Sequence, residues 1–265
     1  MGHFSSMFNS LARSFSNKKA QNNSKSYVKE AADEMAREAK KKAMILKSSG
    51  CVNADGSNNL ASVFSRRGEK GVNQDCAIVW EEFGCQEDMM FCGIFDGHGP
   101  WGHFVSKQVR NSMPISLLCN WQETLSQTTL AEPETDQRFA IWKHLYLKTC
   151  ADVDQELQHH RKIDTFNSGT TALTIVRQGE VIYVANVGDS RAVLATVSEE
   201  GSLTAVQLTV DFKPNIPQAI DIVSSTAERP KAAKRLVEQA VRAWNKKRRG
   251  IAMDDISAVC LFFHS

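Results

Sequence analysis

The stretch Met89-Met90-Phe91-Cys92-Gly93-Ile94-Phe95-Asp96-Gly97-His98-Gly99 is an apolar run that ends abruptly in a polar turn. Seven mostly apolar residues before Asp96 are typical of a buried strand, and Gly97 and Gly99 are typical of a tight turn. An acid at the end of a rigid strand is held firmly, as a metal ligand must be. The same residues also suit an Asx-type turn that closes a hairpin, with His98 on the surface. Taken alone, the stretch leaves both interpretations open.

Composition narrows the class of protein only broadly. The chain has 265 residues, of which 42% are hydrophobic and 23% charged, as in an ordinary globular protein. A net charge of +2 is too small to indicate a nucleic-acid partner. The seven cysteines form no C-x-x-C pair, so we expect neither a zinc site nor a disulfide framework. We therefore expect the protein to reside in a reducing compartment. The longest apolar runs are too short to span a bilayer.

Residues 1–59 differ in composition from the rest of the chain. We interpret 1–26, rich in Ser, Asn and Lys, as a disordered leader, and 27–47 as a peripheral helix. Met1-Gly2-His3-Phe4-Ser5-Ser6 fits the acceptor pattern for N-myristoylation, although so short a pattern also arises by chance. Lys246-Lys247-Arg248-Arg249 fits either a nuclear address or a favourably charged helix end. We expect a cytoplasmic protein, with peripheral association with the plasma membrane or a nuclear location as alternatives.

A single domain is predicted from residue 60 to 265, where strand and helix patterns alternate. A helix is predicted over 101–121, where Pro114 should kink or interrupt it, and a stronger helix follows to Gln158. Gln178-Gly179 and Gly188-Asp189 are predicted to be hairpin turns. The remaining predicted elements are strands at 61–65, 76–80, 89–95, 170–176, 181–187, 191–196, 203–210 and 256–263, and helices at 219–224 and 230–247.

Six stretches, taken in order, resemble the metal-dependent serine/threonine protein phosphatases of the PPM type, also called type 2C. The sequences of these stretches are most similar to those of the plant members of that family. The resemblance implies an α+β fold, an antiparallel β-sandwich flanked by helices, with the active site in a cleft at one end. The matching stretches are Asn73-Gln74-Asp75, Phe95-Asp96-Gly97-His98-Gly99, Ser168-Gly169-Thr170-Thr171-Ala172, Asn186-Val187-Gly188-Asp189-Ser190-Arg191-Ala192, Leu208-Thr209-Val210-Asp211-Phe212-Lys213-Pro214 and Asp254-Asp255-Ile256-Ser257-Ala258-Val259.

The implied activity is metal-dependent hydrolysis of phosphoserine and phosphothreonine in proteins, by a chain that we expect to be a monomer. Two divalent cations, Mg²⁺ or Mn²⁺, neutralise phosphoryl oxygens and lower the pKa of a water in such sites. By resemblance, Asp96 bridges both metals, while the Gly97 carbonyl and Asp254 ligate them. His98 is the implied general acid for the leaving seryl or threonyl oxygen, a role that suits an imidazole.

Two departures from the family pattern affect the phosphate and metal sites. Lys70 stands where the family has an arginine that holds the substrate phosphate, and lysine lacks the bidentate fork. The sequence leaves open whether Arg66 or Arg67 compensates for this change. Gln74 replaces a glutamate that helps to hold a metal through water, so one metal site should be weakened. Asp75 is expected to orient waters behind the metal ligands.

A larger departure is the absence of a long family segment. Its A-x-S/T-R-x-x-G-D element and its D-G-x-W-D element, which supplies a metal aspartate, do not occur here. We infer an internal deletion, as in an alternatively spliced product, with its junction near Gln218-Ala219. The domain should then be incomplete, with exposed sheet edges and apolar surface. A second function therefore stays open: a catalytically impaired, phosphatase-like isoform that acts as a binding or competing module.

Overall fold

The computed structural model describes residues 44–45, 60–86, 88–127, 135–198, 201–209, 218–247 and 250–263. The acylation pattern, the predicted leader and most of the helix predicted over 27–47 lie outside these residues. Met44–Ile45, expected at the end of that helix, instead forms strand β1, which extends the sheet by pairing with β3. Among the described helices, none is both long and apolar enough to cross a bilayer.

The central element is an antiparallel sheet with strand order β1-β3-β4-β6-β7. Its strand β4 (Met89–His98) contains the stretch with which the sequence analysis began, and side chains on both of its faces are buried. This is why β4 is a nearly continuous apolar run rather than an alternating one. The other strands are β3 (Asp75–Glu81), β6 (Ala172–Gln178), β7 (Val181–Val187) and the short β5 (Gly169–Thr170), which pairs with the end of β4.

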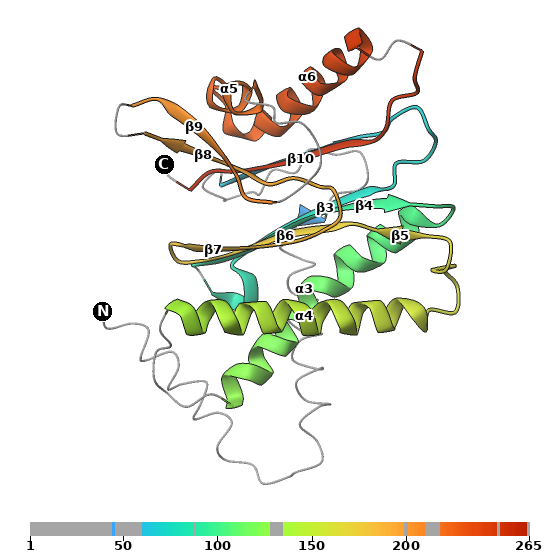
Figure 1. Ribbon diagram of the computed structural model, residues 1–265, viewed down its shortest axis with the longest axis vertical. Helices are drawn as coiled ribbons and strands as arrows, with labels where there is room; N and C mark the ends of the chain where they lie inside the picture. The colour runs from blue at the N-terminus through green and yellow to red at the C-terminus, as the bar shows by residue number, and fades with distance from the viewer. Residues whose placement is uncertain are drawn as a thin grey trace.

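Two long helices, α3 (Gly102–Gln127) and α4 (Thr135–Gln158), cover one face of this sheet (Figure 1). The shared core includes Phe91, Phe95, Val105, Val109, Leu117, Trp142 and Leu145. Pro114 was expected to kink or interrupt the helix; the interruption is wrong, because α3 continues through that residue and on to Gln127. Packing of the buried residues on either side of Pro114 against the sheet stabilises the helix despite the missing backbone N–H.

The opposite face of the sheet packs against a second sheet, formed by β2 (Ala61–Arg66) and β10 (Ile256–Leu261). Ala61 and Val63 contact Met90 and Cys92 across this interface. Beyond it lie α5 (Gln218–Ser224), α6 (Ala232–Lys247) and the short 3-10 turn Arg229–Lys231 before α6. A second 3-10 turn, Phe83–Cys85 after β3, lies on the helical side of the central sheet, where Phe83 belongs to the core shared with α3 and α4. Figure 1 shows the layers in the order helices, sheet, sheet, helices. The predicted antiparallel sandwich flanked by helices is confirmed.

The strands β8 (Val193–Val197) and β9 (Leu203–Gln207) form a separate two-stranded sheet. The hairpin predicted at Gly188-Asp189 is therefore wrong: β7 and β8 belong to different sheets. Gly188 has φ 112°, and the site of a Cβ there lies 2.6 Å from the Thr171 side chain, so the turn packs onto Thr171 and redirects the chain. The β8–β9 hairpin carries several exposed apolar side chains, namely Val193, Val197, Leu203 and Val206.

Candidate active site

The polar turn at the end of β4 leads into α3 rather than into an adjacent strand, so it does not close a hairpin. Asp96 and His98 are exposed, whereas Gly97 between them is buried. The Asp96 backbone N–H donates to Thr171 Oγ1 at 3.0 Å, and the Thr171 N–H donates to the Asp96 carbonyl at 2.9 Å. Thr171 therefore fixes the backbone of the acid that the sequence predicts to be a metal ligand.

Gly97 is required by the close approach of two other chain segments. A Cβ at this position would lie 2.4 Å from the Gly102 carbonyl oxygen and 2.7 Å from that of Gln74. Its own N–H donates to the same Gln74 carbonyl at 3.2 Å. The absence of a side chain thus lets the turn lock against both neighbours, which holds Asp96 and His98 on a rigid backbone.

Asp75 lies directly opposite Asp96 in the β3–β4 ladder and is buried. Its Oδ2 accepts a hydrogen bond from Ser257 Oγ at 2.6 Å. Burial raises the pKa of the Asp75 carboxyl to about 7, and the nearby charges of Asp96, Asp255 and Asp254 act in the same direction, against the Ser257 hydrogen bond. Four carboxyl groups from three chain segments therefore face one region.

Asp254 enters this region from the segment before β10 and forms an ion pair with Lys70. The Lys70 Nζ lies 2.5 Å from Asp254 Oδ2, and both side chains are more than half exposed. The hydrogen bond to Asp254 and its charge raise the pKa of Lys70, with smaller contributions from Asp255 and Asp96. The ammonium group expected to hold phosphate is therefore placed among the acids expected to hold metal.

Asp255, which the sequence analysis gave no role, holds the loop that carries Lys70. Its Oδ1 accepts from the Gly68 N–H at 2.7 Å, and its Oδ2 accepts from the Gln74 N–H at 2.8 Å. Ser257 was also missed, although a polar residue two positions after an acid at a strand start is consistent with both pointing the same way. These contacts join residues more than 180 positions apart in sequence, which no local pattern predicts.

The other predicted site residues lie close to this region or at its edge. Gln74 donates from Nε2 to the Gly99 carbonyl at 3.0 Å, so its amide supports the turn. Arg66 pairs with Ile256 at the end of the β2–β10 ladder, and Arg67 follows it on the surface. Within the described part of the chain, no hydrogen bond or ion pair joins either arginine to Asp96, His98 or Asp254, so compensation for Lys70 by either arginine stays a prediction.

The donor types in this region suit a hard divalent cation, since carboxylate and carbonyl oxygens are the ligands that Mg²⁺ and Mn²⁺ prefer. Burial is the main cause of the raised pKa of Asp75, and the charges of the neighbouring acids add to it; a bound cation would relieve that added repulsion. Yet the described residues contain no group of three or more His, Cys, Asp or Glu side chains arranged to hold a metal ion. The oxygen donors present are of the type that such a cation prefers, but the described residues supply too few of them in one place to complete its coordination.

Comparison with known proteins agrees with this fold. The crystal structure of a serine-threonine phosphatase 2C from Toxoplasma gondii superposes with a TM-score of 0.51 at 18% identity, over 83% of this chain and 77% of that one. This likeness shows the fold. The Protein phosphatase 2C family matches residues 62–218.

Plant relatives match over the whole length of the chain. Probable protein phosphatase 2C 34 of Arabidopsis thaliana is 66% identical over 351 residues, covering 100% of this chain and 98% of the relative. Probable protein phosphatase 2C 73 of the same plant is 60% identical over 357 residues, covering 100% and 95%. Probable protein phosphatase 2C 48 of Oryza sativa subsp. japonica is 40% identical over 356 residues, covering 100% and 99%. The chain belongs to the protein phosphatase 2C family, whose members generally depend on Mg²⁺ or Mn²⁺.

Proposed function

We propose that this chain hydrolyses phosphoserine and phosphothreonine in proteins with the help of Mg²⁺ or Mn²⁺. The observation that carries the proposal is the meeting of Asp96 and His98, at the end of β4, with Asp75 opposite Asp96 in the ladder. The charges of Asp254 and Lys70 reach the same region. Family membership supports the same activity.

The residues proposed to hold the cations are the Asp96 carboxylate, the Gly97 carbonyl and the Asp254 carboxylate. Two cations per domain are expected, and when bound they neutralise phosphoryl oxygens and lower the pKa of a water. Asp75 and Gln74 support these ligands from behind. Asp75 does so across the β3–β4 ladder, and Gln74 through its hydrogen bond to the Gly99 carbonyl.

His98 is proposed to give a proton to the leaving oxygen of the substrate residue. It pairs with Gly169 across the β4–β5 ladder, and the site of a Gly169 Cβ would lie 2.7 Å from His98 Nε2. The ring therefore packs over a residue without a side chain, which defines its position while leaving it exposed. Lys70, itself exposed, attracts the phosphate, and the substrate must compete with Asp254 for its ammonium group.

An internal deletion near Gln218-Ala219 is part of this proposal. The match to the first plant relative extends over 351 residues, whereas this chain has only 265, although the match takes in the whole chain. Part of the relative therefore has no counterpart here, which supports the deletion. The exposed apolar side chains of the β8–β9 hairpin support it too, because strands in a complete sandwich bury one face. We expect the missing metal aspartate to weaken one cation site and to reduce turnover.

A second candidate function is a binding or competing module without turnover. It is favoured by the Lys70–Asp254 ion pair, which occupies a metal ligand, and by the incomplete donor set in the described residues. Bound metal and turnover distinguish the two functions, because a competing module needs neither.

The proposed function is tested with the full chain and a phosphothreonine peptide, in Mn²⁺ and in EDTA. We expect phosphate release that requires Mn²⁺ and falls about a thousandfold in Asp96→Ala, because the cations contribute several kcal/mol to transition-state stabilisation. Asp154→Ala, which removes an exposed acid from α4, is the matched control and should keep full activity. A folded chain that binds no Mn²⁺ and releases no phosphate would instead support the binding module.

The proposed location rests on residues outside the described part of the chain. We propose that Gly2 is acylated and that the chain is cytoplasmic with a fraction at the plasma membrane. Gly2→Ala prevents acylation. The membrane fraction should then appear in the soluble phase after cell fractionation, since binding is only marginal even with one acyl chain. An unchanged distribution would leave the N-terminal pattern as a chance match.

A further inference from the structure

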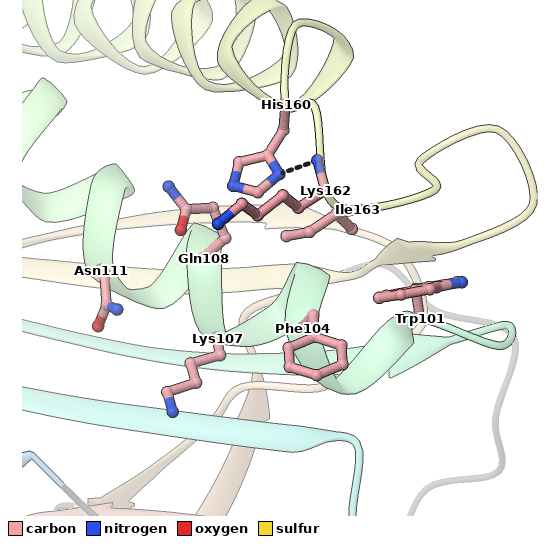
Figure 2. Close-up of a pocket in the computed structure, with 8 residues that line it drawn as sticks. All are labelled: Trp101, Phe104, Lys107, Gln108, Asn111, His160, Lys162 and Ile163. Carbon is pink, nitrogen blue, oxygen red and sulfur yellow. Dashed lines mark hydrogen bonds between the residues drawn. The ribbon is translucent and has the colours of Figure 1, made fainter.

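A hollow of about 450 Å³ lies between the first turns of α3 and the segment that follows α4 (Figure 2). We name it the α3–α4 groove. One wall is Trp101 with Phe104, Lys107, Gln108 and Asn111, and the other wall is His160 with Lys162 and Ile163. Its size lies within the range of sites that bind ligands. No role in the proposed reaction has been given to any of these side chains.

The α3 wall follows from helical spacing. Phe104, Lys107, Gln108 and Asn111 recur at i, i+3, i+4 and i+7, so they share one face of the helix, while a different face carries the core residues Val105, Val109 and Met113. Trp101 and Phe104 contact each other with ring centroids 5.4 Å apart and are 38% and 45% exposed. An exposed aromatic pair of this kind is suited to anchor an apolar side chain of a partner.

The second wall adds positive charge and a hydrogen-bond donor. The backbone N–H of Lys162 donates to His160 Nδ1 at 3.3 Å, which leaves Nε2–H of that tautomer as a donor (Figure 2). Lys107 and Lys162 are exposed, and neither forms an ion pair with any residue in the described ranges. The groove is therefore cationic with an aromatic wall.

The acids around the groove already have partners. Glu156 Oε1 accepts a hydrogen bond from Gln108 Nε2 at 2.9 Å. Asp164 accepts from the backbone N–H groups of Phe166 and Asn167. Neither acid is bonded to Lys107 or Lys162, so both lysine charges are available to a carboxylate that enters from outside.

The groove begins beside the proposed catalytic turn. Trp101 comes three residues after His98, a span of at most about 11 Å. The backbone N–H of Trp101 donates to Ser168 Oγ at 2.9 Å, and Ser168 precedes Gly169, the ladder partner of His98. A peptide whose phosphorylated residue lies at His98 can therefore reach the groove with the residues that flank it.

We propose that the α3–α4 groove binds an acidic segment beside the phosphorylated serine or threonine of the substrate. An apolar side chain of that segment packs on Trp101 and Phe104, and its carboxylates face Lys107 and Lys162. The inference deepens the proposed function and rests on it, because it names the class of phosphoprotein that the site favours.

Two phosphothreonine peptides test the proposal: one with Glu-Glu-Leu beside the phosphothreonine and one with the neutral isosteric flank Gln-Gln-Leu. The variant is Lys107→Glu with Lys162→Glu. The control, Lys143→Glu with Lys246→Glu, makes the same charge change at exposed residues elsewhere. Lys143 lies 15 residues before the end of α4, about 22 Å along the helix. The readouts are kcat/KM for each peptide, the rate with p-nitrophenyl phosphate, and anisotropy of each fluorescein-labelled peptide.

The wild-type chain should prefer the acidic peptide about tenfold in kcat/KM, as expected for two exposed charge pairs, and less at high ionic strength. The Lys107/Lys162 variant should lose this preference and keep its rate with p-nitrophenyl phosphate, while the control keeps both. Equal kcat/KM for the two peptides, or a preference that survives in the variant, would overturn the proposal that the groove binds an acidic segment. Co-sedimentation with phosphatidylserine vesicles is a further readout: a Lys107/Lys162 variant that loses only vesicle binding would also overturn the proposal, since the groove would then bind a membrane surface.

Failure of the groove and failure of the proposed function give different results. Turnover of both peptides without preference contradicts the groove alone. Absence of turnover on every substrate, with acidic-peptide binding that is lost in the Lys107/Lys162 variant, contradicts the phosphatase function and supports the groove as a binding site.

Discussion

Strand β4 and the β8–β9 hairpin both carry many apolar side chains, but those of β4 are buried whereas several of those of the hairpin are exposed. β4 has a helical layer on one face and a second sheet on the other, and Phe91 and Phe95 are fully buried. The hairpin pairs only with itself among the described strands, and its valines are exposed. Apolar strand residues stabilise a fold only where a second layer covers them. The site stands on the covered strand, whereas the exposed hairpin borders the proposed deletion.

The largest expected effect on stability comes from truncating a buried side chain of β4. Phe91→Ala removes a ring that is fully buried and packs against Phe83, with the two ring centroids 5.4 Å apart. It should lower the free energy of unfolding by about 3–5 kcal/mol, as large-to-small core substitutions do. Urea denaturation measures this.

Val206→Ala is the matched substitution in the hairpin, since Val206 is 43% exposed. Its cost should stay below about 0.5 kcal/mol, as for surface positions. A cost close to that of Phe91→Ala would mean that the hairpin face is covered in solution, and the proposed deletion would lose its structural support.

Gly97→Ala should have the next largest effect, at the turn that β4 carries. Its Cβ would meet the carbonyl oxygens of Gly102 and Gln74, so the backbone must move, at a cost of about 1–3 kcal/mol. Because Asp96 and His98 flank this residue, turnover should fall more than stability does. Gly201→Asn, in the hairpin turn with φ 77° and open space around it, should leave turnover unchanged. Equal turnover in the two variants would contradict the locked turn.

How far the sequence predicts the molecule follows the same division. The Met89–Phe95 run predicted β4 because burial on both faces leaves a strong local signal. The patterns at 191–196 and 203–210 predicted two strands but not that they pair with each other, and the turn at Gly188-Asp189 was assigned to the wrong pairing, since sheet membership depends on distant strands. Asp255 and Ser257 could not be assigned roles, because their partners lie at the other end of the domain.

A smaller effect is expected in the pH dependence of stability. The pKa of Asp75 is about 7 in the folded chain, against an ordinary value of 3.8. Between these values the folded state keeps a proton that the unfolded state releases, so stability should fall as pH rises from about 4 to 7. Asp75→Asn should remove this slope, about 1 kcal/mol per pH unit. Denaturation in EDTA measures it, and an unchanged slope would assign the pH dependence to other groups.

The most direct test of the central claim, that the β4 turn is the catalytic centre, is the leaving-group dependence of His98→Asn in Mn²⁺. A seryl or threonyl oxygen needs a proton as it leaves, whereas p-nitrophenolate does not. We expect His98→Asn to lower phosphothreonine-peptide hydrolysis about 10²–10⁴-fold and p-nitrophenyl phosphate hydrolysis only slightly. Equal losses with both substrates, or full activity with the peptide, would contradict the claim.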